Sequence, residues 1–200
     1  MCAAARALLI DFNGLYAYTM SDEISLLLPR RWDLFGRVVE KIVSISAGLA
    51  SSAFTQASGE LAHFDSRVWL GVDDEAVIDY FRWRQADAAR NALHSWCYWT
   101  LRKSGVSVPE AVRQLDRSTA SAQYELLTRH GVTFDQLPAW QCRGVGIYWQ
   151  AYEKEGYDPI MQRPVVTRRR RLAINMELPM NEAYDALLRH IMQAAEEAPV

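Results

Sequence analysis

Cysteine is scarce in this sequence of 200 residues, and its three copies, Cys2, Cys97 and Cys142, are odd in number and far apart. No C-x-x-C pair is present, and the four histidines stand in no metal-ligand spacing. These absences argue against a disulfide framework and against a structural zinc site, so we expect a reducing compartment.

Long apolar runs are also absent, since none approaches the ~18–20 residues that cross a bilayer. The weakly apolar start is interrupted by Asp11 and Asn13, and no signal-peptide pattern follows. We therefore expect a cytoplasmic protein with no membrane partner. The phosphate-binding Gly-x-x-x-x-Gly-Lys loop, the Gly-x-Ser-x-Gly nucleophile turn and a catalytic Cys/His pair are missing too, which excludes the enzyme classes that they define.

The sequence has no excess of charge of either sign, because its formal net charge is -2. A nucleic-acid partner would have to bind a local basic patch and not the whole surface. Half of the residues are hydrophobic, which is enough for a single packed domain over residues 1–200.

Apolar periodicity changes between the strand and the helix pattern along the chain, which predicts an α+β domain. Strands are expected over residues 15–19, 24–28, 63–70, 145–152 and 172–178. Helices are expected over residues 3–13, 34–54, 75–103, from 107 onward, 118–128 and 181–197. Residues 73–74 and 107–110 have the composition of helix N-caps.

An acidic tripeptide, Ser21-Asp22-Glu23, separates the first two expected strands. Adjacent side chains of a two-stranded ribbon point to opposite faces, so the two carboxylates would lie one on each face. A carboxylate at such a turn can bind Mg²⁺, which takes oxygen ligands and shares its coordination shell with substrate phosphates. On spacing alone an exposed acidic turn is the commoner outcome, so both interpretations stay open.

The longest expected helix carries a polar stripe, because Arg84, Asp87 and Asn91 follow one another at separations of three and four. An ion pair that covers the core and a functional contact are equal alternatives for this stripe. Arg82 and Arg84 flank Trp83, and guanidinium groups beside an indole suit contacts with phosphates and bases, although Trp83 itself is expected in the core.

Two further basic groupings are present. Arg37 and Lys41 lie one helical turn apart after the acidic tripeptide, where they could face a triphosphate or could be ordinary surface charges. The run Arg168–Arg171 precedes an expected strand, and alternation would send two of its arginines to each face. Contact with a phosphate backbone and a solvated edge that discourages strand pairing both fit this run.

Three segments stand out when they are taken in chain order: Y-A-Y-T-M-S-D-E at 16–23, F-R-W-R-Q-A-D at 81–87 and L-P-A-W-Q-C-R-G at 137–144. Together they resemble the tRNA(His) guanylyltransferase family. The first is similar to the family's second metal-motif hairpin, the second to its central helix, and the third to its Arg-Gly segment, particularly in bacterial members. The resemblance covers nearly the whole chain.

The resemblance implies a palm-like α+β domain, of the ferredoxin-like kind found in polymerases. It implies an enzyme that adds a GTP-derived nucleotide to the 5′ end of tRNA in the 3′→5′ direction, with GTP and ATP as substrates, two Mg²⁺ ions and a homo-oligomeric assembly. Two such ions clamp the attacking and leaving oxygens and neutralise charge on the phosphates. Asp22 is then the implied Mg²⁺ ligand, and Asp22 and Glu23 are the implied catalytic residues. The implied binding residues are Ser21, Asp22, Arg37 and Lys41 for the nucleotide, and Arg84, Asn91 and Arg143 for the tRNA.

The sequence departs from the family pattern in several places. The family's first strand, with an Asp-Gly-Arg motif, has no counterpart; Ala89 stands where the family often has histidine; and Gln123-Tyr124 replaces Lys-Asn. Asp22 alone would make a poor two-metal site, and loss of a central strand would leave sheet edges unpaired. Two hypotheses follow: a family enzyme present here as a fragment or from a late start, or a short paralogue that binds tRNA or a full-length homologue without catalysis.

Overall fold

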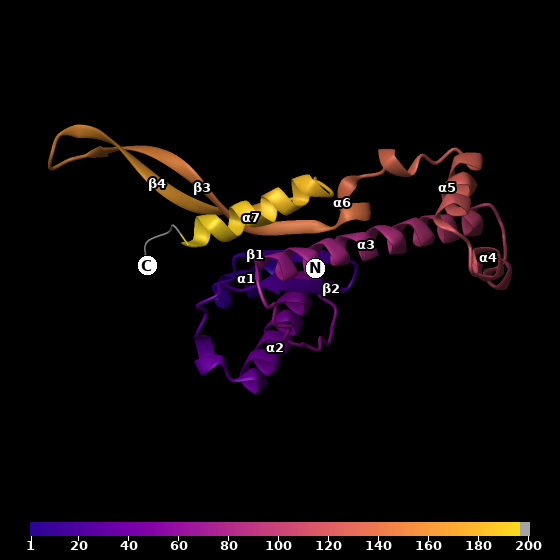
Figure 1. Ribbon diagram of the computed structural model, residues 1–200, viewed down its shortest axis with the longest axis horizontal. Helices are drawn as coiled ribbons and strands as arrows, with labels where there is room; N and C mark the ends of the chain where they lie inside the picture. The colour runs from indigo at the N-terminus through magenta and orange to yellow at the C-terminus, as the bar shows by residue number, and fades with distance from the viewer. Residues whose placement is uncertain (197–200) are drawn as a thin grey trace.

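The chain forms an α+β structure in which helices cover one antiparallel sheet; the computed structural model describes residues 1–196 (Figure 1). The α+β expectation is confirmed. In chain order the elements are α1 (Cys2–Asp11), β1 (Tyr16–Met20), β2 (Glu23–Leu27), the 3-10 turn η1 (Leu34–Arg37), α2 (Val39–Ser58), α3 (Asp74–Lys103), α4 (Val108–Leu115), α5 (Ala120–Arg129), the 3-10 turn η2 (Phe134–Gln136), α6 (Ala139–Arg143), β3 (Val145–Asp158), β4 (Arg163–Asn175) and α7 (Glu182–Glu196).

The four strands lie in the order β2-β1-β3-β4, and all neighbours are antiparallel. Strand β1 is almost entirely buried because both of its edges are paired and both of its faces are covered. Its side chains alternate between the faces, as a strand requires. Ala17 packs with α1 on one face, whereas Tyr16 and Tyr18 point to the opposite face, in the same cluster as residues of α3 and α7.

Aromatic side chains hold the sheet to α3 and α7. The ring of Tyr16 meets Phe81 of α3 edge-on at 5.2 Å, and the hydroxyls of Tyr16 and Tyr184 of α7 are hydrogen-bonded at 2.9 Å. Burial raises the pKa of both Tyr16 and Tyr184 above the ordinary value for tyrosine. The core on this face therefore requires both phenols in their neutral form.

This requirement predicts a loss of stability at alkaline pH. Above about pH 10 the unfolded chain ionises its tyrosines, whereas the folded chain keeps Tyr16 and Tyr184 neutral, so the free energy of unfolding falls as pH rises. Tyr184→Phe should reduce this pH slope, although it also removes the hydrogen bond and lowers stability at neutral pH. Tyr157, which is 63% exposed, is the control, and Tyr157→Phe should leave the slope unchanged. Denaturant unfolding at a series of pH values measures both slopes, and equal slopes for the two variants would contradict the assignment.

Helix α3 extends well past the sheet and organises a second cluster of apolar residues. The carboxylate of Asp73 caps its start by accepting a hydrogen bond from the amide of Ala76 at 2.8 Å, as expected. Helices α4 and α5 pack against its C-terminal half, where Cys97 and Leu101 are buried with Leu127 (Figure 1). None of the helices within residues 1–196 is both long and apolar enough to span a bilayer.

The expected strand at residues 63–70 is wrong, because this segment has no regular secondary structure. Its backbone and the residue before it bond to side chains of α2: the amide of Phe64 donates to the hydroxyl of Ser51, and that of the preceding Ala62 to the hydroxyl of Thr55. The Phe64 ring also packs on Phe54. The hydroxyls of Ser51 and Thr55 therefore accept the hydrogen bonds of backbone amides that, in a sheet, would donate to the carbonyls of a neighbouring strand.

The expected helix at 34–54 is divided, because Phe35, Gly36 and Arg37 all have positive φ and form a separate turn before α2. At the other end of the chain, the last helix was expected to reach Glu197. Helix α7 ends at Glu196, and Glu197 lies outside the described residues.

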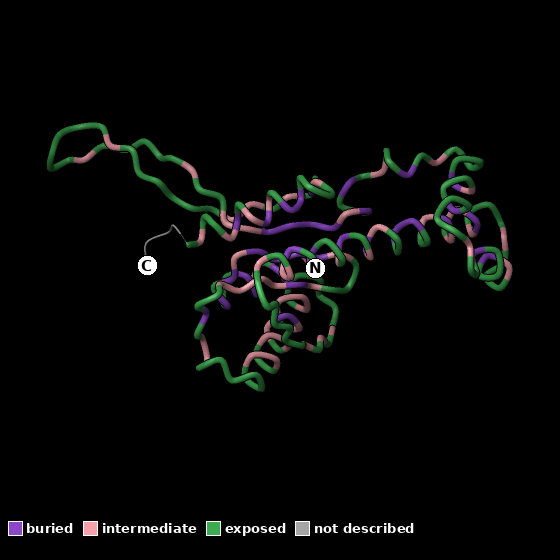
Figure 2. Tube along the Cα trace, in the orientation of Figure 1, coloured by how far each residue is buried: buried purple, intermediate pink, exposed green. Residues whose placement is uncertain are grey.

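The last two strands are much longer than expected. Register pairs run continuously from Gly146↔Asn175 to Asp158↔Arg163, so the polar connection containing Pro164 is itself part of the hairpin. Residues 150–171, which we call the arm, project away from the core and are largely exposed (Figures 1 and 2). The run Arg168–Arg171 therefore lies within β4, not before it.

Candidate active site

The acidic tripeptide forms the tip of the β1–β2 hairpin, as expected. Met20 pairs with Glu23, which leaves Ser21 and Asp22 as a two-residue turn in which Ser21 has φ 54°. The hydroxyl of Thr19 donates to the carbonyl of Glu23 at 2.9 Å and closes the turn. Asp22 is exposed, and within residues 1–196 its carboxylate has no ion-pair partner.

The neighbouring carboxylate is held by the long helix, because Glu23 forms an ion pair with Arg84 of α3. The Arg84 side chain is only 11% exposed, whereas that of Glu23 is 59% exposed. The guanidinium therefore lies beneath the turn and ties it to α3. Arg84 also approaches Asp87 at 3.8 Å and lies over the Trp83 ring, 5.1 Å from its centroid. Trp83 is exposed, so its expected place in the core is wrong.

The polar stripe of α3 is linked as a network centred on Asp87. Its carboxylate accepts hydrogen bonds from Arg90 at 2.8 Å and from the side-chain amide of Asn91 at 3.2 Å. The ion-pair interpretation of this stripe is confirmed. A contact of Asn91 with tRNA stays a prediction.

A buried tyrosine lies beside this network. Tyr18 faces α3 from β1, and its hydroxyl is buried without a hydrogen-bond partner in the described part of the chain. Burial raises the pKa of this phenol above its ordinary range, while nearby Arg84 lowers it and nearby Asp87 raises it. The phenol is therefore neutral and lies within electrostatic reach of both charged groups.

The expected Arg-Gly segment closes over Tyr18. Gly144 has φ 76° and ψ −171°, a conformation that is essentially restricted to glycine, and a Cβ there would lie 2.6 Å from the Tyr18 ring and hydroxyl. Arg143 donates to the carbonyl of Leu178 at 3.3 Å. The segment containing Arg143 is thus brought beside the same side of the sheet as the Glu23–Arg84 pair.

Arg37 and Lys41 are not brought to the acidic turn. Both are exposed, and within the described residues no ion pair joins either of them to Asp22 or Glu23. They lie at η1 and the start of α2, the end of that helix farthest from α3 in Figure 1. Their role at a triphosphate stays a prediction.

The departures at Gln123 and Tyr124 have packing roles. Gln123 is buried in α5 and its side-chain amide donates to Ser118 at 2.8 Å, while Tyr124 packs edge-on against Phe134 at 5.5 Å. Both lie beside the C-terminal half of α3, away from the acidic turn (Figure 1).

The carboxylates of the described residues fit one hard cation better than two. Within residues 1–196 no three Asp, Glu, His or Cys side chains gather as a metal site. Asp22 can supply one oxygen ligand, which suits Mg²⁺ bound mainly through phosphates and water. Glu23 is already bound to Arg84, so the described turn offers no second unpaired carboxylate for a two-ion clamp.

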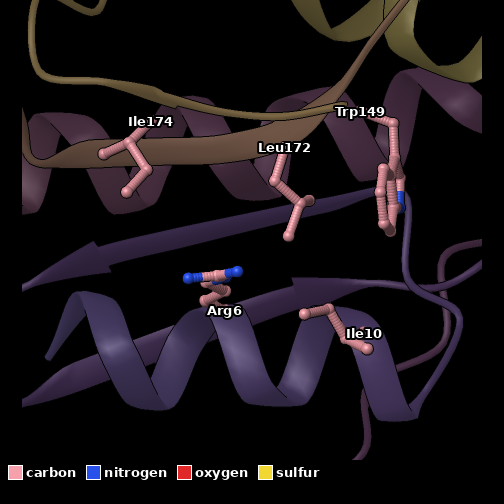
Figure 3. Close-up of a pocket in the computed structure, with 5 residues that line it drawn as sticks. All are labelled: Arg6, Ile10, Trp149, Leu172 and Ile174. Atoms are coloured by element: carbon pink, nitrogen blue, oxygen red, sulfur yellow. The ribbon is translucent and has the colours of Figure 1, made fainter. Parts of the chain in front are cut away.

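A pocket of about 380 Å³ lies on the opposite face of the sheet. It is lined by Arg6 and Ile10 of α1 and by Trp149, Leu172 and Ile174 of β3 and β4 (Figure 3). The indole N–H of Trp149 donates to the carbonyl of Gly14 at 3.2 Å. No residue of the acidic turn lines this pocket, so it is separate from the candidate site.

The fold and the site together define a class of protein: an antiparallel palm-like sheet with an acidic hairpin turn fixed against a long helix. Family models match almost all of the chain: that of tRNAHis guanylyltransferase matches residues 1–72, and that of the Thg1 C terminal domain matches residues 75–185. The chain belongs to the tRNA(His) guanylyltransferase family.

Individual relatives agree with this assignment. The chain is 34% identical over 143 residues to a probable tRNA(His) guanylyltransferase of Dictyostelium discoideum and 30% identical over 149 residues to tRNA(His) guanylyltransferase 2 of Arabidopsis thaliana. These matches cover 66% and 69% of the chain but only 56% and 28% of the two relatives. The chain therefore spans about half or less of these proteins.

Solved structures confirm the expected palm-like fold. A bacterial tRNA(HIS) guanylyltransferase (Thg1)-like protein in complex with GTP has a TM-score of 0.67 at 24% identity, covering 94% of this chain and 74% of that one. The tRNA(His) guanylyltransferase of Saccharomyces cerevisiae has a TM-score of 0.68 at 23% identity, covering 74% and 71%. The match of the first family model begins at residue 1, and the expected loss of a first palm strand stays a prediction.

The Glu23–Arg84 pair can be tested by a double-mutant cycle. Glu23→Gln leaves the mostly buried guanidinium with Asp87, 3.8 Å away, as its remaining charged partner, so we expect it to lower the free energy of unfolding by about 1–2 kcal/mol. With Arg84→Gln as the second variant, the coupling energy should be about 1 kcal/mol. Arg113 and Glu110 of α4, whose side chains are 78% and 33% exposed, are the control, because this guanidinium is far more exposed than that of Arg84, and they should show little coupling. Equal coupling in the two pairs, measured by denaturant unfolding, would argue against a special role for Arg84.

Proposed function

We propose that this protein adds a nucleotide derived from GTP to the 5′ end of tRNA, in the 3′→5′ direction. The observation that carries the proposal is the carboxylate of Asp22, which has no ion-pair partner among residues 1–196 and is held at a hairpin tip that Glu23 and Arg84 fix against α3. Membership of the family and the names of the relatives support the reaction and its substrates.

The proposed roles follow from how each side chain is held. Asp22 would hold Mg²⁺, which when bound offsets negative charge on the triphosphate. Glu23 is committed to Arg84, so we assign it the orientation of the turn, and Ser21 the approach of the nucleotide. A rigid turn matters because a carboxylate displaced by about 1 Å loses its alignment with the reacting phosphate.

The remaining site residues keep proposed binding roles. Arg37 and Lys41 are proposed for the triphosphate, since both are exposed cations on η1 and α2. Asn91 and Arg143 are proposed for tRNA contacts, with Arg84 acting through Glu23. ATP as a second substrate, a homo-oligomeric assembly and a cytoplasmic location belong to the same proposal.

The test is incorporation of labelled GTP into tRNA by the 200-residue chain in the presence of Mg²⁺. The tRNA is offered with a 5′-triphosphate, and separately with a 5′-monophosphate and ATP. We expect a product that is one nucleotide or more longer at its 5′ end. Binding of tRNA without any incorporation, at several Mg²⁺ concentrations, would overturn the proposal.

That outcome would favour the second candidate function, a protein that binds tRNA or a full-length homologue without catalysis. Two observations favour it: the described residues gather no cluster for two metal ions, and Gln123 occupies a position where the family usually has lysine. Its binding should weaken steeply with salt.

A further inference from the structure

Two exposed tryptophans lie next to Tyr80, near the acidic turn. Trp83 of α3 is 54% exposed, and Trp69, in the segment before α3, is 51% exposed. The Trp69 ring stacks on Tyr80, with centroids 5.1 Å apart and ring planes at 17°, and the Trp83 centroid lies 6.1 Å from that of Tyr80. The three rings therefore form one cluster, which we call the aromatic platform.

The platform is attached to the strand that carries the acidic turn. The hydroxyl of Tyr80 is hydrogen-bonded to that of Ser25 of β2 at 3.0 Å, and the Tyr80 ring meets the buried Phe81 edge-on at 5.3 Å. Asp22 precedes Ser25 by three residues, which is about 10 Å of extended chain. A short stretch of a ligand bound at Asp22 can therefore reach the platform.

One face of Trp83 is covered by a cation that also holds the turn. The Arg84 guanidinium lies over the indole, 5.1 Å from its centroid, and forms an ion pair with Glu23. Trp83 is half exposed, so its other face is open to solvent. The same arginine thus fixes the indole and the acidic turn relative to each other.

Trp69 is held by close packing of the backbone that follows it. An added Cβ at Gly71 would lie 3.1 Å from two carbons of the Trp69 ring and 2.7 Å from a methyl group of Val77. The chain at Gly71 therefore lies directly against the indole, whose ring also stacks on Tyr80. Aromatic side chains that are already fixed in this way lose little conformational entropy on binding.

The chemistry around the platform suits a nucleotide better than an apolar protein partner. The centres of protein–protein interfaces are depleted of charged residues, whereas the platform is bordered by Arg84 and Glu23. A nucleotide combines a flat base with polar sugar and phosphate groups. Bases of single-stranded nucleic acid stack on aromatic side chains with little dependence on sequence.

We propose that the aromatic platform stacks unpaired bases of an RNA strand that lies beside the reacting end at Asp22. Two half-exposed indoles, each next to Tyr80, offer places for more than one base, and a free nucleotide has only one. The bases of a duplex are stacked on one another and do not present their faces. The inference deepens the proposed function and rests on it for the identity of the strand, part of a tRNA.

The experiment compares tryptophans that differ in place and not in exposure. Trp69→Leu, Trp83→Leu and the double variant remove the platform. Trp99→Leu is the control, because Trp99 is also in α3 and is 59% exposed, but lies about 24 Å farther along the helix at 1.5 Å per residue. Fluorescence anisotropy gives the Kd of a labelled short single-stranded RNA, of a blunt-ended duplex of the same sequence and of labelled GTP.

We expect each single variant to bind the single-stranded RNA about fivefold more weakly or worse, and the double variant at least about tenfold more weakly. The Kd values for the duplex and for GTP should stay within about twofold, as should all three values for Trp99→Leu. The slope of log K against log salt should not change, because no phosphate contact is removed. Trp83→Phe keeps a ring for stacking and should retain most of the affinity.

Two readouts separate stacking from a purely structural role. Single-stranded RNA should quench the tryptophan fluorescence of the unaltered protein and of Trp99→Leu, but much less that of the double variant. In the incorporation assay the double variant should raise the KM for tRNA and leave the KM for GTP unchanged. Thermal unfolding and circular dichroism check that every variant is folded.

Equal losses in the platform variants and in Trp99→Leu, or equal losses for single strand and duplex, would overturn the proposal. Weaker GTP binding with unchanged RNA binding would assign the platform to a free nucleotide, and a changed oligomeric state with unchanged RNA binding would assign it to a second copy of the chain; both overturn it too. Failure of the proposed function is distinct, because a protein without nucleotide incorporation can still bind single-stranded RNA through the platform.

Discussion

Replacing Asp22 by alanine is expected to lower incorporation of labelled GTP into tRNA by roughly a hundredfold or more, with the free energy of unfolding almost unchanged. The carboxylate has no ion pair within residues 1–196 and lies exposed at the hairpin tip, so its removal breaks no contact of the fold. A loss of activity would therefore report on the site and not on folding. The measurement is the initial rate of incorporation at saturating tRNA.

Two further variants sharpen this test. Asp22→Asn keeps the shape of the side chain and removes its charge, so it should lose nearly as much activity as the alanine variant if a cation is bound there. Asp11→Ala removes another exposed carboxylate, at the end of α1, and should retain full activity. Activity of the Asp22→Ala variant within threefold of the unaltered protein would remove Asp22 from the mechanism.

Gly144→Ala is expected to lower the free energy of unfolding by about 3–5 kcal/mol, the largest change in stability that we predict. Two costs combine at this position. The backbone angles belong to a region that only glycine adopts readily, at about 1–3 kcal/mol, and a methyl group 2.6 Å from the Tyr18 ring adds about 1–3 kcal/mol of overpacking. Denaturant unfolding measures the sum.

Gly59→Ala is the reference for a glycine of positive φ without a close contact. Gly59 ends α2 with the same φ of 76° but with ψ 1°, in the left-handed region that other residues adopt at lower cost, and an added Cβ there would have nothing within 4 Å. Its substitution should therefore cost only about 1 kcal/mol, from the left-handed conformation alone. If the two variants were equally stable, Gly144 would not be a point of close approach to Tyr18. We also expect Gly144→Ala to reduce nucleotide incorporation in the fraction that stays folded, because the displaced Tyr18 ring lies beside Arg84.

Much of the fold was predictable because its signals are local. The polar break at Ser21-Asp22 identified the first hairpin, and Asp73 identified the start of α3 from its capping pattern. The segment at 63–70 misled because Phe64 packs on α2 and the amides of Ala62 and Phe64 bond to hydroxyls of that helix. These hydroxyls lie on a neighbouring helix, seven and thirteen residues earlier in the chain, and periodicity within the segment does not report such partners.

The candidate site was predictable in its residues but not in its contacts. Asp22, Glu23 and Arg84 were all selected from the sequence, yet nothing local indicates that Glu23 and Arg84, sixty-one positions apart, form an ion pair. Tyr18 and Gly144 were missed as partners for the same reason. The alternation Tyr16-Ala17-Tyr18 did indicate that both tyrosines share a face, which is the one signal that could have drawn attention to Tyr18.

Strand β3 joins the candidate active site to the arm without a break. Successive residues of β3 point to alternate sides of the sheet, and each arginine of β4 points to the same side as the β3 residue with which it pairs. A loop joining the two regions would tolerate insertions of any length, whereas an insertion of one residue into β3 or β4 reverses the side chains beyond it. Changes in the length of the arm that leave each of its side chains on its present side must therefore come as even numbers of residues, matched in both strands. Among homologues, the lengths of the two strands should differ together and in steps of two.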